Sequence, residues 1–225
     1  ALHTAPNLTA AMEACYQAQM IVHRDVAAIP AFTPVGYTAH RTYYGNYPGE
    51  EKYAGREWEG FINELGVGFS NFWSFLNVHP QGFEKGGTLR QGMSGDIDGF
   101  NPVHAEWSTD WLVLNEIYEP LVKYHPYNAT EYVPWLAESY EVGTWEKPGV
   151  GTCTKIRFHV FPALFHDDEI VDAYDVAFTF QYLKDQLSIA WYWAVIDFDH
   201  AEVIDRFTVD IFYDCQSVWA LSWCR

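Results

Sequence analysis

The chain has 225 residues, of which 13 are Lys or Arg and 30 are Asp or Glu, so its formal net charge is −17. This acidity argues against a protein that holds nucleic acid through phosphate contacts, because such contacts need clustered cations. Hydrophobic residues make up 49% of the chain and charged residues 19%, which is typical of an ordered globular protein. At roughly 150 residues per domain, the length predicts one large domain or two small ones.

The longest apolar runs, such as residues 191–196, are shorter than the ~20 residues that a membrane-spanning helix needs. No charged-then-apolar leader opens the chain, and its end lies in an aromatic stretch, so we expect a mature fragment of a longer protein. Two sequons for N-glycosylation begin at Asn7 and Asn128 and fit an exported chain.

The cysteines are widely spaced and form no C-x-x-C pair, which excludes a zinc ribbon or a redox motif. They are Cys15, Cys153, Cys215 and Cys224. We expect them to be small buried hydrophobes rather than disulfides, and the pair to test first is Cys215 with Cys224.

Apolar residues four apart open the chain and predict an amphipathic helix with Thr9 as its N-cap. They are Leu8, Met12, Tyr16 and Met20. Proline at Ile29-Pro30 should end this helix and begin an extended segment. Residues 33–80 show little periodicity, which predicts an irregular, loop-rich surface without a second core, and Gly86-Gly87 marks a new start.

A short strand is predicted over Thr88–Gly92, followed by turns over 94–102. A helix should then begin at a cap on Ser108, because apolar residues recur at steps of three and four. They are Trp107, Trp111, Leu114, Tyr118 and Leu121. Alternation over 155–160 predicts a half-buried strand with Ile156, Phe158 and Val160 on its inner face.

Asp172 predicts the N-cap of another helix, with Asp175 at the third helical position and Val171 packing on Val176. Alternation of Phe207, Val209 and Ile211 with Thr208 and Asp210, after Val203-Ile204, predicts a hairpin. The chain is therefore predicted to mix α and β structure.

Two enzyme or metal motifs are incomplete. The run Asp96-Ile-Asp98 begins like a calcium loop, but Trp107 stands where the bidentate glutamate should be. Gly92-Met-Ser94-Gly95 lacks the second glycine of a nucleophile elbow, since Asp96 occupies that place.

A group of imidazoles and carboxylates could supply metal ligands. It comprises His159, His166, Asp167, Asp168 and Glu169. An acidic turn between a strand and a capped helix explains the same residues, so we predict no metal, no other cofactor and no catalytic residue.

Aromatic residues make up 18% of the chain. Several of them cluster beside turns, at Phe72-Trp73, at Trp107 with Trp111, and at 191–193. Such rings commonly line ligand clefts, where they give large apolar area at low entropy cost. For each ring taken alone, a place in the core is the simpler interpretation.

Residues 86–213 together resemble the opening of a family 5 extracellular solute-binding protein, the oligopeptide, dipeptide and nickel receptors of ABC importers. The order and spacing of the segments carry this resemblance. They are Gly86-Gly-Thr-Leu89, Phe100-Asn-Pro102, Ile117-Tyr-Glu-Pro-Leu-Val122, Pro134-Trp-Leu-Ala-Glu-Ser-Tyr-Glu-Val142, Lys155-Ile-Arg-Phe158, Phe165-His-Asp167, Asp172-Ala-Tyr-Asp-Val-Ala-Phe178 and Asp205-Arg-Phe-Thr-Val209. The family usually has glycine after His-Asp, whereas this chain has Asp168, so the turn there is expected to differ.

Residues 8–47 resemble the other end of the same family, so the order is tail, then head. The resemblance implies a partial periplasmic-binding-protein type 2 architecture, with residues 1–80 a C-terminal-type segment and 81–225 a first lobe plus small domain. The parent chain is either a tandem pair or a permuted unit, joined near residues 75–85. Most of the second lobe is expected to be missing.

The resemblance places Glu106, Trp107 and Ser108 beside a bound peptide, Phe32 near the ligand, and Tyr192 and Trp193 in a loop facing the cleft. It implies a non-enzymatic receptor, extracellular or periplasmic and anchored through the rest of the parent chain. Its partners would be a peptide or other small solute and an ABC permease. The alternative is a cell-surface structural or assembly protein that keeps the fold without transport.

Overall fold

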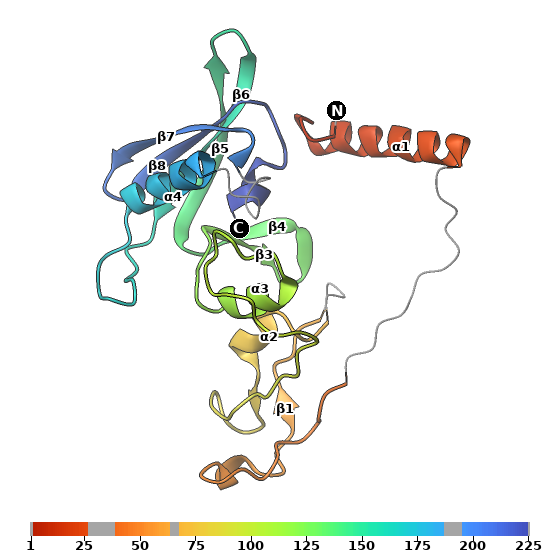
Figure 1. The fold of residues 1–225 in the computed structure, drawn as a ribbon, viewed down its shortest axis with the longest axis vertical. Coiled ribbons are helices and arrows are strands. Elements are labelled where there is room, and N and C mark those ends of the chain that lie inside the picture. The colour runs from red at the N-terminus through yellow and green to blue at the C-terminus, as the bar shows by residue number, and fades with distance from the viewer. Residues whose placement is uncertain (1, 27–38, 64–67, 187–194, 225) are drawn as a thin grey trace.

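The structure is a computed structural model that describes residues 2–26, 39–63, 68–186 and 195–224 (Figure 1). Its elements in chain order are α1 (Leu8–Asp25), η1 (Glu51–Tyr53), β1 (Trp58–Glu59), α2 (Phe72–Asn77), β2 (His79–Pro80), α3 (Ser108–Leu114), β3 (Val122–His125), β4 (Asn128–Pro134), β5 (Ala137–Lys147), β6 (Gly151–Val160), α4 (Ala173–Asp185), β7 (Phe198–Asp205), β8 (Thr208–Tyr213) and η2 (Ala220–Cys224). The predicted mixture of α and β structure is confirmed.

The main sheet has four antiparallel strands in the order β5-β6-β8-β7, and α4 packs across it (Figure 1). The predicted inner face of β6 is confirmed, because Ile156, Phe158 and Val160 are all buried. The predicted hairpin is also confirmed, with Val203 paired to Val209.

Strand β8 differs from the prediction because all six of its residues are buried, Thr208 and Asp210 included. Its outward face is covered by neighbouring side chains: Lys155 and Arg157 of β6 both reach the carboxylate of Asp210. A period-two pattern identifies the strand but does not show that charged partners cover its polar face.

Helix α4 begins as predicted. The Asp172 carboxylate accepts a hydrogen bond from the Tyr174 amide over 2.9 Å, and Asp175 returns the contact by accepting from the Asp172 amide over 2.9 Å. Val171 and Val176 both lie in the buried core. This reciprocal cap satisfies amides that a helix start leaves without partners.

Helix α1 is confirmed, but its N-cap is Asn7 and not the predicted Thr9. The Asn7 side chain accepts a hydrogen bond from the Ala10 amide over 2.9 Å. Asn7 fits because it lies before the first turn in extended backbone. The predicted apolar stripe is exposed, from 47% at Met12 to 66% at Met20, and Figure 1 shows α1 projecting away from the sheet. The expected extended segment after Ile29 lies outside the described residues.

The chain preceding α1 is tied to the chain following β8. The Val218 amide donates to the Ala5 carbonyl over 2.8 Å, and the Ser217 hydroxyl donates to the His3 carbonyl over 2.7 Å. Residues more than two hundred positions apart therefore share one surface of the main domain.

The described parts of 39–80 are largely irregular, as predicted, but they also hold a small aromatic core, which the prediction missed. Tyr44 is 3% exposed and packs against Trp58 and Tyr53, with ring centroids 5.0 and 5.4 Å apart. A side chain at Gly87 would place its Cβ 2.8 Å from the Tyr44 ring. These rings are not periodic in sequence, so no element pattern reveals them.

The predicted strand over Thr88–Gly92 is wrong, since this stretch is irregular. The Thr88 amide donates to the Tyr44 hydroxyl over 2.7 Å, a side-chain contact where a strand would have a ladder bond.

The predicted junction, residues 75–85, contains the end of α2 and strand β2, which pairs with β1. The boundary at residue 80 stays a prediction. Within the described ranges, no helix combines the length and apolar character that crossing a bilayer demands.

Candidate functional site

The site predicted from sequence lies at the start of α3, where Glu106, Trp107 and Ser108 are all exposed. Trp107 is 65% exposed, among the most exposed large apolar side chains that the structure describes. A tryptophan left in water forgoes the burial that normally stabilises it, by roughly 25 cal/mol per Å² of apolar area. Its exposure leaves the ring available for contact with a ligand, although a single exposed apolar side chain is in itself normal on a protein surface.

The backbone around Trp107 is held firmly. The buried Asp110 carboxylate accepts from the Asp98 amide over 2.9 Å, and the Trp111 indole N–H donates to the Ala105 carbonyl over 3.0 Å. The Thr109 hydroxyl adds a bond to the Asp96 carbonyl over 3.2 Å. These contacts fasten the turns before α3 to its first helical residues, so Trp107 stands on a fixed base.

Helix α3 is shorter than predicted. It begins at Ser108 but ends at Leu114, and Trp107 occupies the cap position without a side-chain hydrogen bond. The predicted cap at Ser108 is thus wrong, as is the helical extension through Tyr118 and Leu121. Pro120 disfavours a helical residue before it, and its ring nitrogen cannot donate.

The ring pair Phe72-Trp73 packs α2 onto β3. The Trp73 indole N–H donates to the Tyr124 carbonyl over 2.9 Å, and the Phe72 ring lies 5.1 Å from that of Trp135. The Lys123 ammonium lies 3.3 Å from the Phe72 ring centroid. Burial lowers the pKa of Lys123, against the opposing effect of Glu116 and Glu119.

Sequence reasoning missed an open groove of about 400 Å³ that α3 helps to line. Its lining comes from four separate segments: Trp58, Phe75, Val78, Gly86, Gly87, Leu89, Gln91, Leu112, Val113, Glu116 and Ile117. The only feature of the sequence that points to this region is the pair Gly86-Gly87, which lies too close to aromatic rings for a side chain. Residues 106–108 do not line this groove.

The acidic turn after β6 is a tight hairpin. The Phe165 amide donates to the Glu169 carbonyl over 2.8 Å, and the Asp168 amide donates to the Phe165 carbonyl over 3.1 Å. Asp168 adopts φ +69°, the left-handed region that favours glycine. The turn thus has the backbone shape expected of glycine, although the side chain differs. Among the described residues, no three potential metal ligands gather.

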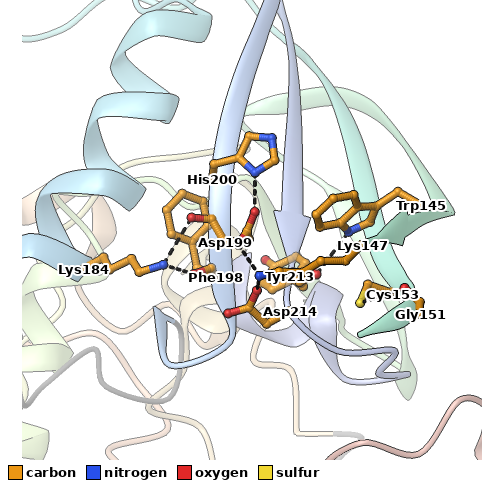
Figure 2. Close-up of polar contacts among 10 residues, drawn as sticks. All are labelled: Trp145, Lys147, Gly151, Cys153, Lys184, Phe198, Asp199, His200, Tyr213 and Asp214. Carbon is orange, nitrogen blue, oxygen red and sulfur yellow. Dashed lines mark hydrogen bonds and ion pairs between the residues drawn. The ribbon is translucent and has the colours of Figure 1, made fainter. Parts of the chain in front are cut away.

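The other charged cluster ties strands of the main sheet together. Figure 2 shows Lys147, at the end of β5, between Asp199 of β7 and Asp214 after β8. Its Nζ lies 2.5 Å from Asp199 Oδ1. Burial alone would raise the pKa of Asp199, but hydrogen bonds from Lys147 and His200 lower it to about 2. Hydrogen bonds to Asp199 and Asp214 raise the pKa of Lys147. These charges satisfy one another, so the cluster is structural.

The remaining predicted site residues are the two sequon asparagines, which the structure describes, and three aromatic residues, which it does not. Asn7 caps α1, and Asn128 accepts from the Thr130 amide over 3.1 Å, so both sequon side chains have structural partners. Their glycosylation stays a prediction. Phe32, Tyr192 and Trp193 lie outside the described residues.

The described elements form a mixed α/β fold, with residues 106–108 exposed on the turn before α3. No family model and no curated protein matches the chain. Solved structures that match part of it are solute-binding proteins. The structure of NikA from Brucella suis, in complex with Fe(III)-EDTA, is 25% identical, with 52% of this chain and 22% of that chain covered and a TM-score of 0.41.

Two further matches are of the same kind. The binding protein AgaA from A. tumefaciens R10, in complex with agropinic acid, is 25% identical, with 58% and 25% covered and a TM-score of 0.48. The ABC transporter-associated DppA from Helicobacter pylori, in complex with peptide STSA, is 21% identical, with 52% and 25% covered and a TM-score of 0.40. The chain thus spans about a quarter of the length of these proteins or less. They are the kind of protein that the sequence resembles.

Proposed function

We propose that the chain is part of a non-enzymatic, extracellular or periplasmic solute-binding receptor that captures peptides or similar small solutes for an ABC-type importer. The observation that carries the proposal is Trp107, which is 65% exposed on a turn fastened at both sides. A rigid aromatic surface gains contact area with little ordering cost, because its backbone is fixed before the ligand arrives.

The neighbours of Trp107 supply the polar part of such a site. Glu106 offers a carboxylate and Ser108 a hydroxyl, both exposed beside the ring, which suits a ligand with amide and amine donors. A single wall removes only part of a ligand from water, so this chain alone is expected to bind weakly. The rest of the parent chain would provide the second wall, the anchor and the contact with the permease.

Incorporation of 5-fluorotryptophan into the whole chain and fluorine NMR test the proposal. Trp107→Phe assigns the Trp107 resonance and Trp73→Phe assigns that of a packed control. Titration with a mixture of tripeptides to millimolar concentration should shift the Trp107 resonance and leave Trp73 in place. An unchanged Trp107 resonance, or equal shifts of the Trp107 and Trp73 resonances, would overturn the proposed receptor function and favour the structural alternative.

A further inference from the structure

The groove beside α3 carries one carboxylate in otherwise apolar surroundings. Apart from Gln91 and Glu116, its lining consists of apolar side chains and two glycines. Leu89 and Ile117 are 38% and 41% exposed there, so apolar surface faces the opening. Its volume of about 400 Å³ falls within the range of small-molecule sites, about 300–1,000 Å³.

Glu116 lacks a close partner at this groove. Among the residues that the structure describes, none forms an ion pair or hydrogen bond with its carboxylate. The nearest influential cation is Lys123, whose ammonium lies over the rings of Phe72 and Trp135, 3.3 and 5.6 Å from their centroids. Although Glu116 reaches solvent, its apolar surroundings raise its pKa, against the effect of Lys123.

We propose that this groove is a second binding site, for a primary amine joined to a compact aromatic or aliphatic group. The ammonium would form a charge-assisted hydrogen bond with Glu116, which has no closer cation among the described residues. The apolar group would cover Leu89, Val113 and Ile117. The net charge of −17 favours a cation over an anion of the same size.

Calorimetric titration of the whole chain with 2-phenylethylamine tests this site, with 2-phenylethanol as the neutral ligand of the same shape. The amine should bind about tenfold more tightly than the alcohol, since one charge-assisted bond distinguishes them. Glu116→Gln should remove this difference. Glu138→Gln is the matched control, because it deletes an exposed carboxylate on β5 that does not line the groove.

A second variant tests the apolar part of the site. Leu89→Trp adds bulk at an exposed groove position and should weaken both ligands. Equal affinity of amine and alcohol, or equal losses in Glu116→Gln and Glu138→Gln, would overturn the proposal, as would unchanged binding in Leu89→Trp. The Trp107 resonance reports on the peptide surface separately, so the two proposals can fail independently.

Discussion

The indole N–H of Trp73 donates to the backbone carbonyl of Tyr124 over 2.9 Å and so joins residues 51 positions apart. The bond fastens α2 to β3, and beside it the rings of Phe72 and Trp135 pack edge to face with the Lys123 ammonium over both. Trp73 belongs to the segment that resembles a family tail, and Tyr124 to the one that resembles a head. At this contact the two segments share one packed interface.

Trp73→Phe is therefore expected to lower the free energy of unfolding by about 1–2 kcal/mol, because the hydrogen bond is lost and the smaller ring fills less space. Urea unfolding followed by circular dichroism measures the change. Trp107→Phe, at an exposed position, should change stability by less than about 0.5 kcal/mol. Equal effects in both variants would show that the interface contributes nothing.

Asp168 is expected to be a site where substitution stabilises the protein. Its φ of +69° disfavours a residue with a Cβ, and its exposed side chain has no hydrogen bond among the described residues. Asp168→Gly should raise the free energy of unfolding by about 0.5–1 kcal/mol, while Asp168→Ala should lower it slightly. Thermal unfolding of the three proteins checks the order, and a less stable glycine variant would contradict the assigned turn.

The elements that sequence predicts well are those whose signals are local. The cap at Asp172 and the alternation around Phe158 need only a few neighbouring residues, and both are confirmed. The end of α3 and the burial of Asp210 depend on distant partners, so their predictions fail.

The candidate site divides in the same way. The resemblance located Trp107, and the structure leaves that side chain exposed. The groove at Glu116 is assembled from four separated segments, and the exposed stripe of α1 shows that amphipathic spacing predicts a face but not what covers it. The groove has no periodic signature in the chain, and the cover of the α1 stripe has none either.

The cysteines should differ sharply in reactivity. All four are free, and burial raises the pKa of Cys215 and of Cys224 to about 12, while it also raises that of Cys153. Cys15 instead lies on the exposed helix α1. Because the thiolate is the reactive form, Ellman's reagent at mildly alkaline pH should label one thiol quickly and the others only on unfolding. Cys15→Ser should abolish the fast phase, and a fast phase that persists would contradict this assignment.

The buried carboxylate of Asp210 should make stability depend on pH. Arg157 donates to it over 2.6 and 2.7 Å and Lys155 over 3.1 Å. The Arg157 hydrogen bonds lower the pKa of Asp210, burial acts in the opposite direction, and Lys155 adds to the lowering. Asp210→Asn should therefore cost about 2–3 kcal/mol near neutral pH, because the ionised partner of two cations is lost.

The sign of the pH effect follows from the lowered pKa. A carboxyl that titrates lower in the folded chain than in the unfolded one, near 3.9, stabilises the fold above that pH and loses the contribution as pH falls through the folded-state pKa. Urea unfolding should give a constant difference between wild type and Asp210→Asn from about pH 7 to about pH 5, and a shrinking one below about pH 4. Glu202→Gln, opposite Asp210 on β7 and exposed, is the matched control and should show neither effect. If the difference stayed constant into the acid range, Asp210 would not be held ionised by Arg157, because protonation would then leave its contribution unchanged.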